Sequence, residues 1–120
     1  MSEEFLRVAK KEISQDISEI GNLLKNCSDD NDLIKNALNI EKYTHKIKGL
    51  APMMGQEEMG QIATLLDKLL KSVATGMHSA GIYQTVRRSC IFMQNALDGV
   101  ATDFQSLRLE IEENHQNLLQ

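Results

Sequence analysis

The chain has 120 residues, of which 42% are hydrophobic and 25% are charged. This length and balance fit one globular domain that buries its own core, and they argue against a disordered tail or a membrane protein. The formal charge is −4 and no short window is rich in lysine and arginine, so nucleic acid is not an expected partner. The sequence therefore predicts a single soluble domain over residues 1–120, which we expect to be a monomer.

The amino terminus and the cysteines indicate the compartment. Residues 1–4 are acidic and lead into an amphipathic stretch, whereas a signal peptide needs a basic start and a continuous apolar run. Cys27 and Cys90 fall outside any C-x-x-C pattern. Each recurs at the spacing of the hydrophobic residues around it, so both are interpreted as reduced core residues. No segment is apolar enough to span a bilayer, and the expected location is the cytoplasm.

Hydrophobic periodicity predicts helices from the amino terminus onward. Apolar residues recur every three or four positions, which predicts a helix over about 3–26 with Ser2 as its N-cap. The polar cluster 28–31 marks a turn, and the next apolar stripe predicts a second helix that ends near residue 51 because Pro52 follows. Gly55 is expected to make the turn after it.

Two further stripes and a tail complete the pattern. The third stripe runs from Met59 to Val73 and is closed by Gly76, and the fourth runs from Ile82 to Val100 with a weak break at 98–99. A fifth helix is expected over about 101–118, outside a core bundle over about 3–100. Low aromatic content and short polar connectors favour an all-α fold, an antiparallel up-down four-helix bundle with this additional C-terminal helix.

The segment Thr44-His45-Lys46-Ile47-Lys48-Gly49 carries the functional interpretation. At 100° per residue, His45 falls about a quarter turn from the centre of its apolar stripe, so its ring is expected at the edge of the core. A histidine held there can present one ring nitrogen as a nucleophile if the other nitrogen donates to a fixed acceptor.

Three other residues support this use of His45. Lys48, three positions later, can place its ammonium beside a phosphoryl group on the imidazole. Gly49, four positions later, leaves no side chain over the ring and so gives a partner access. Asp67 lies just off the third stripe, where an antiparallel bundle lets its carboxylate accept from the inner ring nitrogen of His45.

On these residues the chain resembles the histidine-containing phosphotransfer family, and within it the amino-terminal phosphoacceptor domain of chemotaxis-type histidine kinases. His45, Lys48, Gly49 and Gly55 match the family's H-x-x-K-G segment and its later glycine, and the helix order agrees over nearly the whole chain. Asp67 stands where that kinase domain usually has a glutamate bonded to the histidine. The chain departs from the family pattern in this shorter acid, in Lys46 and in Pro52.

The resemblance implies that His45 accepts phosphoryl from a histidine kinase or a phosphorylated receiver and passes it to a response-regulator receiver domain. The chain would be a carrier rather than an enzyme and would hold no cofactor, with magnesium supplied by the receiver. Two alternatives remain open: a docking module that is not phosphorylated, and the first domain of a longer histidine kinase. A histidine–metal site is not expected, because His78 and His115 lack paired spacing and are interpreted as solvated.

The surface around His45 has two further features with open interpretations. Lys42, Lys46 and Lys48 surround the histidine and Glu41 offsets them, which fits either a solvated helix face or steering toward an acidic receiver pocket. Leu50 and Met53 lie away from the core phase, where an apolar patch would suit docking.

Overall fold

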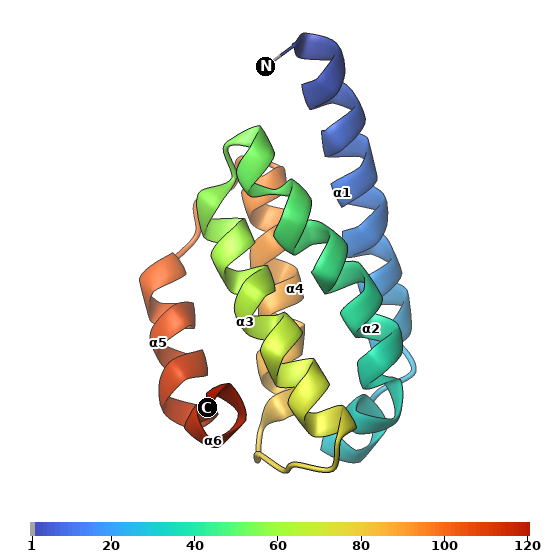
Figure 1. The fold of residues 1–120 in the computed structure, drawn as a ribbon, viewed down its shortest axis with the longest axis vertical. Coiled ribbons are helices and arrows are strands. Elements are labelled where there is room, and N and C mark those ends of the chain that lie inside the picture. The colour runs from blue at the N-terminus through green and yellow to red at the C-terminus, as the bar shows by residue number, and fades with distance from the viewer. Residues whose placement is uncertain (1) are drawn as a thin grey trace.

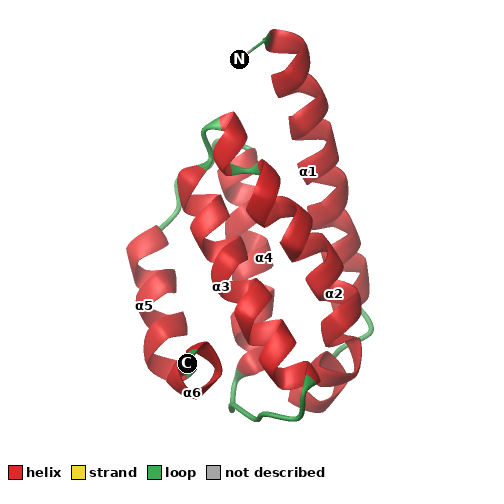
Figure 2. Ribbon diagram, viewed as in Figure 1, coloured by secondary structure: helices red, strands yellow, loops and turns green. Residues whose placement is uncertain are grey.

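The computed structural model describes residues 2–120, in which helices are joined by short turns and no strand occurs. Four helices, α1 (Glu3–Leu24), α2 (Asp30–Leu50), α3 (Glu57–Ala74) and α4 (Ile82–Leu97), run alternately up and down (Figures 1 and 2). Each packs on the next, and α4 returns to contact α1, which closes the bundle. The predicted all-α antiparallel architecture is confirmed.

Side-chain caps explain where the first two helices begin. The Ser2 hydroxyl accepts a 3.0 Å hydrogen bond from the Phe5 amide at the start of α1, as the sequence predicted. Within the polar cluster 28–31 the cap is Asp29, whose carboxylate accepts from the Asp32 amide at 2.9 Å. Ser2 thus fixes the start of α1, and Asp29 fixes the start of α2 after the α1–α2 turn.

Pro52 and Gly55 shape the turn between α2 and α3. Pro52 begins a short 3-10 turn, η1 (Pro52–Met54), and Gly55 ends it with φ of +82°, a left-handed conformation that favours glycine. A side-chain carbon on Gly60 of α3 would lie 2.7 Å from the Pro52 ring carbon Cγ. The absence of a side chain at Gly60 therefore lets the end of α2 rest directly on α3.

The predicted stripes converge on one core. The side chains that are both large and almost wholly inaccessible come from the four helices of the bundle, namely Ile13, Ile20, Leu33, Ile40, Ile47, Met59, Ile62, Leu66, Leu69, Leu70, Ile82 and Met93. The assignment of Val100 to the fourth stripe is wrong, because this residue is 54% exposed. The helix has already ended at Leu97, and Gly99 adopts a positive φ of 73° that turns the chain outward.

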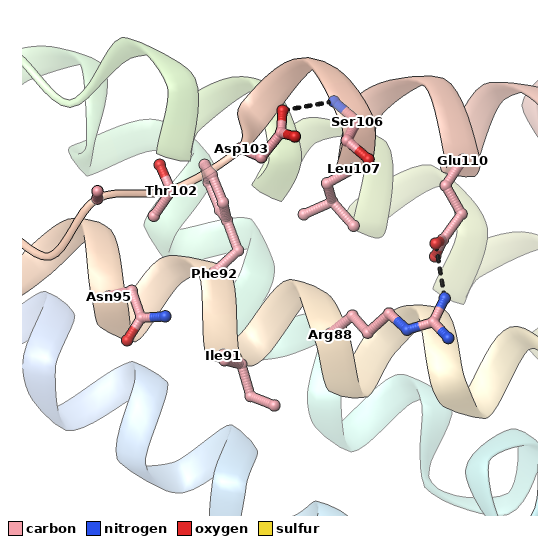
Figure 3. Close-up of a pocket in the computed structure, with 10 residues that line it drawn as sticks. Arg88, Ile91, Phe92, Asn95, Thr102, Asp103, Ser106, Leu107 and Glu110 are labelled. Atoms are coloured by element: carbon pink, nitrogen blue, oxygen red, sulfur yellow. Dashed lines mark hydrogen bonds and ion pairs between the residues drawn. The ribbon is translucent and has the colours of Figure 1, made fainter.

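The C-terminal segment forms two helices where one was predicted over 101–118. α5 (Phe104–Asn114) and α6 (Gln116–Leu119) are separated at His115, and α6 packs on α3 (Figure 1). α5 is attached to α4 by the Phe92 and Phe104 rings, 6.2 Å apart, and by a 2.6 Å ion pair between Arg88 and Glu110. Figure 3 shows this ion pair at one end of a pocket between α4 and α5.

Among residues 2–120, no helix combines the length and the apolar character that crossing a bilayer requires.

Candidate functional site

His45 lies on α2 next to the fully buried Thr44, and its own side chain is 59% exposed. The geometry agrees with the predicted position beside the core, since Thr44 faces inward and His45 is displaced by one residue around the helix. Its ring nitrogen Nδ1 faces two carboxylates, and Nε2 has no hydrogen-bond or ion-pair partner among residues 2–120. One ring nitrogen is therefore held near acid groups while the other is unengaged.

The two carboxylates near Nδ1 come from different helices. The Asp67 Oδ1 atom of α3 lies 3.7 Å from Nδ1, and the Glu41 Oε2 atom, one helical turn before His45 on α2, lies 3.8 Å away. Both distances are too long for a direct hydrogen bond and fit either a bridging water or a small ring movement. The structure thus brings His45 and Asp67 together, and it adds Glu41, which the sequence interpretation treated only as a charge offset.

Asp67 is the buried centre of the cluster, with a side chain only 4% exposed. Its Oδ2 atom accepts from Lys71 at 3.1 Å and from Lys48 at 3.4 Å, whereas its Oδ1 atom is buried without a hydrogen-bond partner. Lys71 was missed by the sequence interpretation, although its i,i+4 spacing from Asp67 on one helix was a visible signal.

The Asp67 and Glu41 carboxyl groups have opposite pKa shifts. Burial alone would raise the pKa of Asp67, but its proximity to Glu41 and its contacts with Lys71 and Lys48 hold it below its usual value. The contact with Asp67, followed by burial, raises the pKa of Glu41. The two lysine ammonium groups therefore favour the ionised form of Asp67 beside the histidine.

Lys46 belongs to a separate ion-pair group between α1 and α2. Its ammonium lies 3.0 Å from Asp16 and 3.1 Å from Glu12, so it is paired away from Asp67. Asp16 is 3% exposed, and burial, opposed by Lys46, raises its pKa. Of the three lysines that the sequence placed around His45, only Lys48 contacts the acid that faces the ring.

The surface beside His45 is open. A side-chain carbon on Gly49 would have no heavy atom within 4 Å, so the space over this part of α2 is free for a partner. Beyond it, Met53 is 52% exposed and Leu50 is half-buried, which places apolar surface near the end of α2. A shallow depression beside His45 is lined by Glu41, Lys42, His45, Lys46 and Lys71.

The other two histidines differ in their surroundings. His78 is exposed, as predicted, but the interpretation of His115 as solvated is wrong because its side chain is completely buried. The Thr85 hydroxyl lies 2.7 Å from its Nε2, and the Ser79 hydroxyl 2.5 Å from its Nδ1. Both ring nitrogens have partners, which makes burial tolerable. The sequence did hold a signal, since His115 is four residues after the buried Ile111 in the helical stripe.

Both cysteines are free thiols. Cys27 is buried and Cys90 is half-buried, in partial agreement with the prediction that both are core residues. Burial raises the pKa of the Cys90 thiol to about 11, so it is not an activated nucleophile.

The cluster combines an exposed imidazole, two carboxylates and two ammonium groups, a set suited to holding a phosphorylated ring or a cation. The donor atoms of Glu41, His45 and Asp67 all lie within 4.8 Å of one another, so they are also the residues that could hold a metal ion. Comparisons with protein-family models, curated proteins and solved structures found no match to this chain.

Proposed function

We propose that this protein is a histidine phosphotransfer protein that accepts a phosphoryl group on Nε2 of His45 and passes it to the aspartate of a response-regulator receiver domain. The observation that supports this most is the asymmetric setting of the ring. Nδ1 faces Asp67 and Glu41 at 3.7 and 3.8 Å, while Nε2 is free on a side chain that is 59% exposed.

In the proposed reaction a neutral His45 carries its proton on Nδ1, so that Nε2 has the lone pair. Nε2 attacks the phosphorus of an aspartyl phosphate, an N–P bond forms, and the P–O bond to the aspartate breaks to leave a carboxylate. The phosphorylated ring retains the Nδ1 proton and is cationic, which the neighbouring ionised Asp67 favours electrostatically. Transfer to the next receiver is the same reaction in reverse.

Lys48 and Gly49 take separate roles in this proposal. The Lys48 ammonium is held near the ring through Asp67, from which it can turn toward the phosphoryl oxygens. Gly49 keeps the helix surface clear, so that the acidic pocket of a receiver, with its magnesium ion, can approach Nε2. The partners expected are therefore a receiver domain and, as original donor, a histidine kinase.

The test is phosphorylation by several phosphorylated receivers, or by kinases with ATP, followed by measurement of acid-labile, base-stable phosphate. We expect label on the wild type and on His78→Gln, a matched change at an exposed histidine, and none on His45→Gln. Label that persists in His45→Gln would refute the assignment of the acceptor. No label on the wild type with any competent donor would favour the alternative, a docking module that is not phosphorylated.

A further inference from the structure

The donor atoms around Nδ1 of His45 have the spacing of a metal site. Nδ1 lies 3.7 Å from Asp67 Oδ1 and 3.8 Å from Glu41 Oε2, and all three donors lie within 4.8 Å of one another. In a tetrahedral zinc site with bonds of about 2.0–2.1 Å, two donor atoms are about 3.4 Å apart. The two distances from Nδ1 therefore exceed this spacing by only about 0.3–0.4 Å, and the two carboxylate oxygens lie within 4.8 Å of each other.

The Oδ1 atom of Asp67 is an unexplained feature of the metal-free protein. The Asp67 side chain is 96% buried and both lysines contact its other oxygen, so Oδ1 has no hydrogen-bond partner and points to the space shared with Glu41 and His45. Glu41 Oε2 lies 3.8 Å from the same Nδ1 atom, so two carboxylate oxygens border this space. A bound cation would satisfy Oδ1 and offset the negative charge of the two carboxylates.

The donor set selects the kind of ion. One imidazole nitrogen with two carboxylates suits zinc and similar transition metals, whereas magnesium and calcium prefer oxygen ligands alone. Three protein ligands leave a fourth position for water, and the depression beside His45 and Lys71 gives access from solvent. The ammonium groups of Lys48 and Lys71 beside Asp67 oppose a dication, so the affinity should be moderate rather than that of a structural site.

We infer that Glu41, His45 and Asp67 form a binding site for a divalent transition-metal ion of the zinc class, with Nδ1 of His45 and one oxygen of each carboxylate as ligands. A metal on Nδ1 withdraws electron density from the ring and displaces the proton that the proposed reaction retains. Zinc would therefore slow phosphoryl acceptance at Nε2. The slowing of phosphoryl acceptance rests on the proposed function, whereas metal binding itself does not.

Binding is tested with zinc alone, by calorimetry on the full chain in a buffer that does not chelate metal. We expect one zinc per chain in the wild type and in His78→Gln. Because losing even an outer-shell partner typically costs about 10–100-fold in metal affinity, Asp67→Asn and His45→Gln should each weaken binding by at least about tenfold. Circular dichroism checks that each variant folds, and nitrogen-detected histidine NMR should show the zinc-dependent shift at Nδ1 of His45.

Three outcomes would overturn the inference: no zinc binding by the wild type, unchanged binding in folded His45→Gln, or a shift confined to other residues. Cys27→Ser and Cys90→Ser serve as further controls, since binding that disappears with a thiol would place the ion elsewhere. The phosphorylation assay above is run with a zinc-selective chelator that leaves magnesium available to the receiver and the kinase. A failure of phosphotransfer and a failure of metal binding are therefore read independently.

Discussion

Gly49 and Gly60 are both helical glycines, but their surroundings predict opposite effects of the same substitution. A methyl group at Gly49 meets nothing within 4 Å, so Gly49→Ala adds only helix propensity and should stabilise the protein by about 0.5–1 kcal/mol. At Gly60 the same methyl would lie 2.7 Å from Cγ and 3.0 Å from Cδ of Pro52. These are distances at which the ring or the helix must shift.

The expected cost at Gly60 follows from this contact. Forcing an extra methyl into packed space costs about 1–3 kcal/mol, and the same propensity gain of about 0.5–1 kcal/mol offsets part of it. Gly60→Ala should therefore lose up to about 2.5 kcal/mol of unfolding free energy, and because the propensity gain is common to both variants, they should differ by the packing cost of about 1–3 kcal/mol. The Pro52 ring is rigid and ends α2, so it cannot turn away as a flexible side chain would.

Urea unfolding followed by far-UV circular dichroism measures both variants against the wild type, with equal m-values as the condition for comparing midpoints. The double change Gly60→Ala with Pro52→Ala removes the contact and should recover most of the loss. If Gly60→Ala is as stable as Gly49→Ala, Pro52 does not pack on α3 in this way, and the reasoning fails.

Three more results are expected. Burial lowers the pKa of His115 below its usual 6.5, so below about pH 6.5 the unfolded chain binds more protons than the folded protein. The free energy of unfolding should therefore fall as the pH drops, by at most about 1.4 kcal/mol per pH unit for one proton. Urea midpoints of the wild type should depend on pH more steeply than those of His115→Gln, and equal slopes would contradict this. Lys46→Met leaves the buried Asp16 without its cation and should lower the melting temperature. The double variant Lys46→Met with Asp16→Leu should recover the melting temperature. A double variant no more stable than Lys46→Met would be inconsistent with the ion pair. Because burial raises the pKa of Cys90 to about 11, its thiol should react with iodoacetamide at pH 8 far more slowly in the native protein than in urea. Peptide mass spectrometry follows the reaction, and equal rates would show that the thiol is exposed.

Much of the candidate site could be predicted because its residues share one helix. His45, Lys48 and Gly49 lie within five consecutive positions, and helical geometry alone places them on one surface beside the buried Thr44. The spacing of Asp67 from the stripe of the third helix was enough to place it toward the second. The same local rule would have found Lys71, one turn after Asp67.

Other features depended on how helices meet, and periodicity does not describe that. The pairing of Lys46 with α1, rather than with the residues around His45, follows from the packing of α1 on α2. His115 is buried because hydroxyls from the segment before α4 and from α4 itself reach its two ring nitrogens.

The sequence by itself determined the four helices of the bundle, their order and the exposure of His45, because these follow from a repeat of 3.6 residues and from the turn residues between stripes. Only the tertiary structure decided that Glu41 joins His45 and Asp67 and that, among residues 2–120, one oxygen of Asp67 is left without a partner. Such contacts depend on ångström-scale offsets between two packed helices, which the pattern along a single chain does not encode.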